Sequence, residues 1–245
     1  MIGDLVSRWI HPARVIPKRD DSTEDIDAFI DSRALEYATK SDDAFVERAL
    51  KLGVGSGMVL DVGTRAGLIV LKILWQNENF FSIGVDSSSA MIDRARETAA
   101  AWGLGERAFF QVGDARRMRL KTDYFDLVVS DGVFHRFPDP VSVLSEIGRV
   151  LKPKGGLLIR DFRRPNRFKM ARDIVGQTQS YGNRMRPQIE EALRAAYTPA
   201  ELRQMLKASQ IEGARVVELD EHHIAIEREG MTDPNSWVSV REQYR

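Results

Sequence analysis

The stretch from Met58 to Trp75, MVLDVGTRAGLIVLKILW, most constrains how this 245-residue chain can fold. It opens with a short apolar run rich in β-branched residues, typical of a buried strand, and closes with an apolar helical pattern. Gly63 and Gly67 bracket the turn between them. Because glycine has no Cβ, a ligand can lie directly against the main chain of such a turn. The stretch predicts a strand, a turn that binds a mononucleotide-like ligand, and a helix.

The glycine spacing restricts the ligand. The dinucleotide fingerprint G-x-G-x-x-G keeps only its first glycine in the run GTRAGL, and no phosphate loop ending in Gly-Lys-Ser/Thr is present. The stretch instead resembles motif I of class I S-adenosylmethionine-dependent methyltransferases, V-L-D-x-G-x-G-x-G. Four of its five diagnostic positions match, namely Leu60, Asp61, Gly63 and Gly67.

The fifth position, the middle glycine of the motif, is Arg65 in this chain. The resemblance implies that the cofactor-binding loop consists of Asp61, Gly63, Thr64, Arg65 and Gly67. A long cation there would crowd or repel a sulfonium, or point outward, or bind the carboxylate of the cofactor. The alternative of a fold that binds the cofactor poorly therefore stays open.

A second apolar run, Phe80–Asp86, ends in an acid 19 residues beyond Gly67. This is close to the spacing at which α/β nucleotide folds present a carboxylate to the ribose hydroxyls, and one carboxylate can accept from both. Capping the next helix is the alternative role for Asp86. The segment resembles the family's D-x-S-x-x-M pattern, with Ser87 where relatives place an apolar residue against the adenine.

A third buried run is followed by Gly113, Asp114 and Ala115. The resemblance implies that Asp114 accepts a hydrogen bond from the adenine amino group, while the amide of Ala115 meets a ring nitrogen. Capping a turn is the other interpretation of Asp114.

A fourth strand leads through Ser130 into the run DGVFHRFPDP at 131–140. Together they resemble the stretch S-N-G-V-L-H-H-L-P-D-P of the small-molecule, type 11-like branch of these methyltransferases. Ser130 is expected at the cofactor end of its strand. His135 is the only histidine in the ligand-end motifs, and an imidazole suits a general base near neutral pH. We therefore interpret His135 as a candidate catalytic base, with a structural role as the alternative.

Apolar runs that alternate with amphipathic helices require parallel pairing and right-handed crossovers. Segments 214–219 and 222–227 alternate around a turn, which predicts a terminal antiparallel hairpin. We expect an α/β, Rossmann-like, doubly wound and mostly parallel seven-stranded sheet with helices on both faces. Ligands bind at the carboxyl ends of the strands in such sheets.

The resemblance covers residues 41–229, with an expected helix over Ser41–Leu52. Residues 1–40 are expected to form an N-terminal cap segment, and 230–245 a C-terminal tail. Residues 163–196 form an arginine-rich insertion after the fifth strand. Its cations predict either a solvated helix face or a lid that selects an anionic substrate or touches RNA phosphates.

Composition excludes several functions. Lysine plus arginine and aspartate plus glutamate each number 36, which argues against a global field that recruits nucleic acid or membranes. There is no cysteine for disulfides or thiolate metal sites, and His222 and His223 are expected on opposite faces of a strand, so no metal site is expected. No run approaches the ~20 apolar residues of a membrane span, so a cytoplasmic protein is expected. The oligomeric state stays open, with a homodimer among the options.

These patterns predict an enzyme that transfers a methyl group from S-adenosylmethionine to a small-molecule acceptor. One alternative is an RNA or protein methyltransferase that uses the arginine-rich insertion. The other is a non-catalytic binding or assembly module that keeps the methyltransferase fold.

Overall fold

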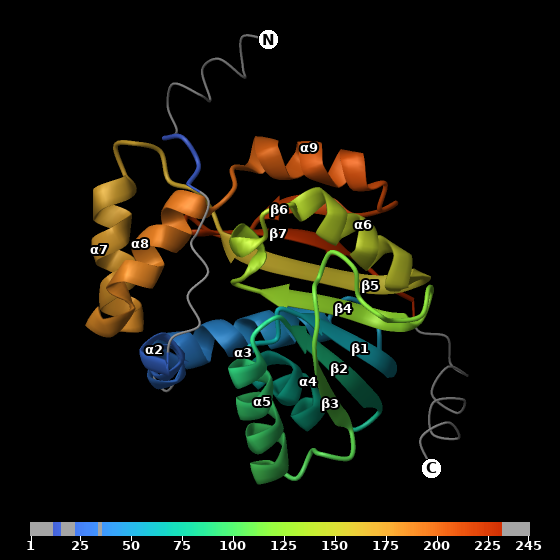
Figure 1. The fold of residues 1–245 in the computed structure, drawn as a ribbon. Helices are drawn as coiled ribbons and strands as arrows, with labels where there is room; N and C mark the ends of the chain where they lie inside the picture. The colour runs from blue at the N-terminus through green and yellow to red at the C-terminus, as the bar shows by residue number, and fades with distance from the viewer. Residues whose placement is uncertain (1–11, 16–22, 34–35, 232–245) are drawn as a thin grey trace.

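Seven strands form one sheet in the order β3-β2-β1-β4-β5-β7-β6 in the computed structural model, which describes residues 12–15, 23–33 and 36–231 (Figure 1). Strands β1 to β5 pair in parallel, whereas β7 is antiparallel to both β5 and β6. The strands are β1 (Gly57–Val62), β2 (Phe80–Asp86), β3 (Ala108–Val112), β4 (Phe125–Asp131), β5 (Leu151–Phe162), β6 (Arg215–Glu218) and β7 (His223–Arg228). The Rossmann-like sheet and its terminal hairpin are confirmed.

Helices cover both faces of the sheet (Figure 1). On one face lie α3 (Glu36–Leu50), α4 (Leu68–Gln76) and α5 (Ser89–Ala101), and on the other lie α6 (Pro140–Val150) and α9 (Pro199–Ser209). The remaining described helices are α2 (Thr23–Arg33), α7 (Met170–Tyr181), α8 (Arg186–Ala195) and the short turns η1 (Phe134–Arg136) and η2 (Asn183–Met185). Strands β1 and β4 are covered on both sides, which explains their nearly continuous apolar sequences.

Two boundaries differ from the expectation. Helix α3 begins at Glu36 and not at Ser41, because residues 36–40 continue the helix and bury Ala38 ahead of Phe45 on the same element. Strand β5 begins at Leu151 and includes residues 152–156, whose lysines, proline and glycines are typical of a turn. Its pairing with β4 shifts register between Phe125 and Leu127, so the lysine- and glycine-rich turn is a bulge inside the strand.

The arginine-rich insertion folds into α7, η2 and α8. An isolated β-bridge joins Arg163 to Tyr197, and the amide of Arg164 donates to the Tyr197 carbonyl at 3.1 Å. The two ends of the insertion therefore lie side by side. Figure 1 shows α7 and α8 together beside the carboxyl end of the sheet, on the same side as α2.

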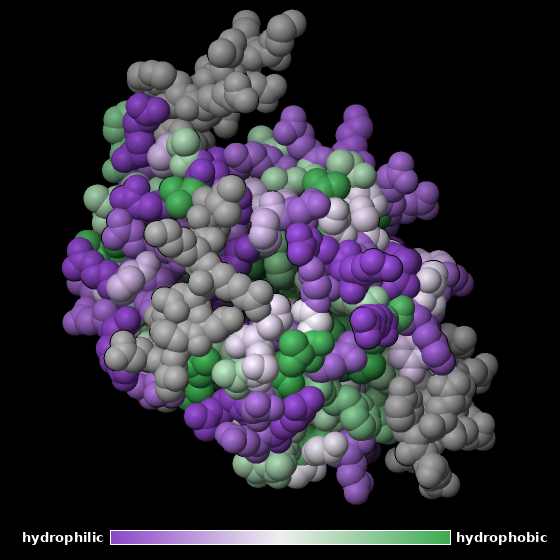
Figure 2. Space-filling view, viewed as in Figure 1, coloured by the Kyte–Doolittle hydropathy of each residue, from purple (hydrophilic) through white to green (hydrophobic). Residues whose placement is uncertain are grey.

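Parts of the expected terminal segments, residues 1–11, 16–22 and 232–245, lie outside the described residues. Helix α3 runs across residue 40, where the cap was expected to end. On the face in Figure 2, hydrophobic residues occur in small separate patches among hydrophilic ones. None of the described helices combines the length and the apolar character that a membrane crossing requires.

Candidate active site

The sheet order reverses between β1 and β4, and two cavities lie at the carboxyl ends of the strands around this point. The first has a volume of about 500 Å³ and is called the motif cavity here. Five residues singled out from the sequence motifs line it together with Arg65: Gly63, Asp86, Ser87, Asp114 and Ala115.

Asp86 is fixed at the end of β2 by two main-chain amides. Its Oδ2 accepts from the amide of Arg65 at 3.0 Å and its Oδ1 from the amide of Ser88 at 2.9 Å. Each carboxylate oxygen has capacity for a further hydrogen bond. Ser88, and not Asp86, provides the side chain that caps α5. The carboxylate is thus held facing the cavity with room to accept from a diol.

Asp114 lines the motif cavity but also forms a bidentate ion pair with Arg116, with Nη2 at 2.6 Å from Oδ2. Both side chains are about half exposed. An exposed pair of this kind is weak enough to open for a ligand.

Arg65 adopts a left-handed backbone conformation, with φ of 49°. Its guanidinium lies 4.5 Å from the ring centre of Phe29 on α2, and Nη2 donates to the carbonyl of Gly132. The long side chain is therefore directed across the carboxyl end of β4 toward α2. Of the directions considered from the sequence, the structure shows this outward one.

Asp61 and Thr64 lie behind the loop. Both line a small cavity of about 20 Å³ with Gly63 and Arg65, and Thr64 Oγ1 donates to Asp61 Oδ2 at 2.7 Å. Burial raises the pKa of Asp61 to about 7, with nearby Asp131 and Asp86 adding to the rise and the Thr64 hydroxyl opposing it. The side chain of Asp61 thus holds the loop through its hydrogen bond with Thr64.

The two motif glycines are required by packing. Both have positive φ, 74° at Gly63 and 78° at Gly67. A Cβ at Gly63 would lie 2.4 Å from Val133, and one at Gly67 would lie 2.9 Å from the ring of Phe110. The close approach at Gly67 is to Phe110 of β3 and Ala95 of α5, and its contact with a ligand stays a prediction.

Ser130 also lies away from the cavities. It is fully buried, and its Oγ donates to the carbonyl of Val62 at 2.7 Å. This bond ties β4 to β1 just before the strands separate. The hydroxyl of Ser130 therefore has a structural role, and a contact of this residue with the cofactor stays a prediction.

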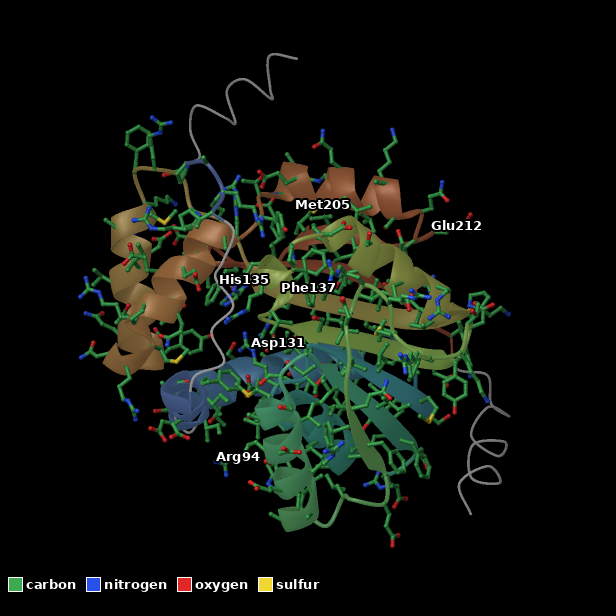
Figure 3. The ribbon with its side chains drawn as sticks, viewed as in Figure 1. Arg94, Asp131, His135, Phe137, Met205 and Glu212 are labelled. Carbon is green, nitrogen blue, oxygen red and sulfur yellow. The ribbon has the colours of Figure 1, made fainter. Side chains whose placement is uncertain are left out.

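The second cavity, called the acceptor cavity here, has a volume of about 370 Å³. It lies between α2, the insertion and the ends of β4, β5 and β7. Figure 3 shows Asp131 and His135 on the side of the sheet that faces α2 and α8. The apolar part of the wall comes from Ile26, Phe29, Met91, Phe162, Tyr181, Met185, Pro187, Ile189 and Ala192.

His135 lines the acceptor cavity and pairs with Asp161 at the end of β5. Its Nδ1 lies 2.8 Å from Asp161 Oδ1, and its main-chain amide donates to Oδ2 at 2.6 Å. Both side chains are about one-twentieth exposed. Arg14 holds the same turn from outside, because its Nη2 donates to the His135 carbonyl at 2.6 Å. Asp161 was not among the residues predicted from the sequence, although it lies near the end of an apolar strand, as Asp86 does.

Three residues, Arg65, Met91 and Arg136, line both cavities. They form the boundary between the motif cavity and the acceptor cavity. Groups bound in the two cavities would therefore lie next to the same three side chains.

Asp131 occupies the position where the resembling stretch has asparagine, and the structure gives the reason. Its carboxylate forms a bidentate ion pair with Arg160 on β5, at 2.7 and 2.9 Å. Both side chains are about one-tenth exposed. The acid at this position thus balances a buried cation.

Most described cations of the insertion are paired with acids. Arg163 pairs with Glu218, Arg164 with Glu201, and both Lys169 and Arg172 with Glu221. Arg184 pairs with Asp31, and Arg194 with Glu190. The basic run seen in the sequence is therefore largely neutralised within the fold.

Residues 55–220 match the family described as methyltransferase domain. The chain belongs to this family. The seven-stranded sheet and the motif residues identify it as a class I member, the class whose cofactor is S-adenosylmethionine.

A demethylmenaquinone methyltransferase of Deinococcus radiodurans is 32% identical over 135 residues, which is 49% of this chain and 55% of that protein. The chain spans about half the length of the sequence relatives it matches. The structure of a SAM-dependent methyltransferase from Aquifex aeolicus aligns with a TM-score of 0.62 at 23% identity, covering 86% of this chain and 98% of that one. A Haemonchus contortus phosphoethanolamine methyltransferase, solved with S-adenosylhomocysteine, aligns with a TM-score of 0.61 at 20% identity, covering 80% and 44%.

The motif cavity fits the family's cofactor. Its volume lies within the range of about 300–1,000 Å³ that is typical of small-ligand sites. Carboxylates at the ends of two neighbouring strands, Asp86 and Asp114, suit a ligand that carries both hydroxyls and an amino group.

Proposed function

We propose that this class I methyltransferase transfers a methyl group from S-adenosylmethionine to a hydroxyl oxygen of a small-molecule acceptor. The observation that carries the proposal is the His135–Asp161 contact in the acceptor cavity, which adjoins the motif cavity across Arg65, Met91 and Arg136. In this arrangement Asp86 accepts from the ribose hydroxyls, Asp114 and the amide of Ala115 hold the adenine, and the acceptor binds beside His135.

The histidine is oriented for proton abstraction. A carboxylate only accepts hydrogen bonds, so the neutral imidazole carries its proton on Nδ1, toward Asp161. Nε2 then has the lone pair that takes the proton from the acceptor hydroxyl. Asp161 is held by its own contacts to the amides of His135 and Phe162, at 2.6 and 2.7 Å, so the pair is in place before an acceptor binds.

The rest of the rate enhancement would come from holding the two reacting groups close together. When bound, S-adenosylmethionine would supply an electrophilic methyl carbon and a sulfur leaving group that keeps the electron pair of the broken carbon–sulfur bond. The two cavities hold the reacting groups on either side of one boundary, and such proximity can supply much of the rate. The apolar side chains in the wall of the acceptor cavity would disfavour competing water beside the acceptor.

A small molecule fits the charge pattern better than RNA. Phosphate contacts need cations whose charge is available, and binding through them falls steeply with salt. Because most cations of the insertion are held in ion pairs, they do not form a basic surface for phosphate groups. We therefore take the acceptor cavity as the recognition site.

The first experiment is calorimetric titration with S-adenosylmethionine and S-adenosylhomocysteine, with Asp86→Ala as the control. We expect saturable binding that the variant loses. Methyl transfer from labelled S-adenosylmethionine to a library of small hydroxylated molecules then identifies acceptors. His135→Asn should lower kcat by about 10²–10⁴-fold with the cofactor Kd unchanged.

Two results would count against the proposal. The intact protein could fail to bind either cofactor form, or the His135→Asn variant could turn over an identified acceptor at the wild-type rate. The matched variant Asp161→Asn should lower kcat by less than His135→Asn, because it removes the orientation of the base and not the base itself.

A further inference from the structure

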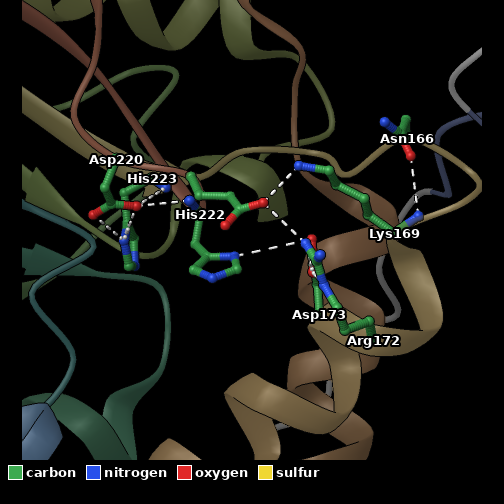
Figure 4. Close-up of polar contacts among 8 residues, drawn as sticks. Asn166, Lys169, Arg172, Asp173, Asp220, His222 and His223 are labelled. Atoms are coloured by element: carbon green, nitrogen blue, oxygen red, sulfur yellow. Dashed lines mark hydrogen bonds and ion pairs between the residues drawn. The ribbon is translucent and has the colours of Figure 1, made fainter.

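A second histidine lines the acceptor cavity. His223 is the first residue of β7, lines the cavity and is buried. Its Nδ1 lies 2.9 Å from Asp220 Oδ2, and its main-chain amide donates to Asp220 Oδ1 at 2.8 Å (Figure 4). His223 therefore repeats the arrangement of His135, with an aspartate that orients the ring through Nδ1.

The ring of His223 is also fixed by stacking. It lies parallel to the ring of Phe162, with 5.4 Å between centroids and 24° between planes. Phe162 in turn meets the edge of Tyr181, at 6.3 Å and 81°. The imidazole thus stands in an aromatic wall made by β5, β7 and α7, which matches the flat face of an aromatic ligand.

The turn that carries this histidine is tied to the insertion. Glu221 Oε1 accepts from Lys169 Nζ at 2.6 Å and from Arg172 Nη2 at 2.9 Å. The β6–β7 turn and the start of α7 are joined by these contacts. The position of His223 is therefore set relative to the helices that form the rest of the wall.

Asp220 determines which hydrogen bond His223 can offer. Burial raises the pKa of the Asp220 carboxyl, but the His223 ring and two main-chain amides outweigh burial and hold that pKa below its ordinary value. An ionised carboxylate only accepts, so Nδ1 of His223 carries a proton. In the neutral ring, Nε2 is then an acceptor for a ligand hydroxyl, as it is in His135.

The charges around the acceptor cavity cancel. Among the described residues that line it, the cations are Arg65, Arg136 and Arg160, and the acids are Asp131, Asp161 and Glu191. A cavity without excess charge favours a neutral ligand over a phosphate ester or a quaternary amine.

We propose that the acceptor is a neutral aromatic molecule with two hydroxyl groups, one methylated next to His135 and the other donating a hydrogen bond to Nε2 of His223. His223 is then a specificity-determining residue, and Asp220 positions it. This inference rests on the proposed methyl transfer, with His135 as the base. It adds the class of acceptor and the residue that recognises it.

The test uses matched aromatic pairs. Dihydroxynaphthalene isomers are compared with 1-naphthol and 2-naphthol, both for binding in the presence of S-adenosylhomocysteine and for transfer of labelled methyl. We expect at least one diol to have a KM about three- to tenfold below that of its single-hydroxyl partner, the gain expected of one hydrogen bond. His223→Phe should remove this difference by raising the KM of the diol to that of its naphthol.

Two further variants separate recognition from folding. His223→Asn keeps an acceptor and should restore part of the preference for the diol. His222→Phe changes the neighbouring residue, which is not among those that line the cavity, and should keep the full preference.

The proposal is overturned if every diol behaves like its naphthol, if His223→Phe weakens both classes equally, or if the protein saturates with S-adenosylhomocysteine but binds none of the diols. That last result leaves methyl transfer to another acceptor standing. Failure to bind S-adenosylhomocysteine at all, by contrast, would remove the proposed function itself.

Discussion

The main-chain amide of Arg65 donates a hydrogen bond to Oδ2 of Asp86, 3.0 Å away, from a left-handed backbone conformation. The family motif has glycine at this position, where such a conformation costs little. The contact that fixes Asp86 comes from the backbone, and the side chain of Arg65 serves a different purpose against Phe29 on α2. Backbone and side chain can therefore be tested separately.

Arg65→Ala should loosen α2 without disturbing the cofactor contact. The variant keeps the Cβ, and hence the backbone cost, but loses the contact with Phe29, which is worth about 0.5–2 kcal/mol. Hydrogen exchange of the α2 amides should become faster, while the Kd for S-adenosylhomocysteine stays within about threefold. Arg65→Gly also relieves the backbone and should recover about 1 kcal/mol of stability relative to Arg65→Ala. Unchanged exchange in α2 would contradict this assignment.

Asp61→Asn should change how stability depends on pH. The pKa of Asp61 is raised to about 7 in the folded protein by burial, above the unfolded value of 3.8. The folded state therefore favours the protonated acid, and this contribution is complete below about pH 4 and lost as pH rises toward 7. Relative to wild type, the variant should gain unfolding free energy across this window, by up to about 4 kcal/mol. Urea titrations at pH 5 and pH 8 check this, and parallel curves would refute it.

Ser130→Ala should lower stability and leave the cofactor site intact. It removes a buried hydrogen bond to the Val62 carbonyl, at a cost of about 1–3 kcal/mol. Ser82 provides the matched control, because it is equally buried and its Oγ has no hydrogen-bond partner among the described residues. Ser82→Ala should be close to neutral. Calorimetry should give the wild-type Kd for S-adenosylhomocysteine with both variants. A large loss of affinity in Ser130→Ala would instead support the cofactor contact expected from the sequence.

Asp131→Asn, which installs the residue of the resembling stretch, should destabilise this chain by about 3–5 kcal/mol. It would leave the buried guanidinium of Arg160 without its bidentate partner. The double variant Asp131→Asn with Arg160→Met should recover most of the loss, because no buried charge then remains at the pair. A thermodynamic cycle from urea denaturation measures the coupling, and additive losses would show that the two residues act independently.

The residues that line the motif cavity could be singled out from the sequence because each belongs to a local pattern. Asp86 and Asp114 each end an apolar run, and parallel pairing brings such ends to one edge of the sheet. The helix start at Ser41 was wrong because helix α3 is extended by tertiary packing of residues ahead of it, which local capping rules do not contain.

The contacts around the acceptor cavity could not be predicted in the same way. The contact between His135 and Asp161 joins η1 to β5, and the contact between Arg65 and Phe29 joins the loop to α2. Neither pair has a sequence spacing that points to it. Likewise, the pairing of the arginines in the insertion with acids on other elements follows only from the fold.

The β-bridge between Arg163 and Tyr197 holds together the two ends of the segment between them. This segment, called the cassette, could therefore be exchanged as one unit. Its two ends are already adjacent, so lengthening or shortening the cassette adds little to the entropy of closing it. It supplies much of the acceptor wall, whereas Asp86 and Asp114 lie outside it. Substrate range can thus diverge among related chains, or be redesigned in this one, by replacing a single continuous piece of the gene.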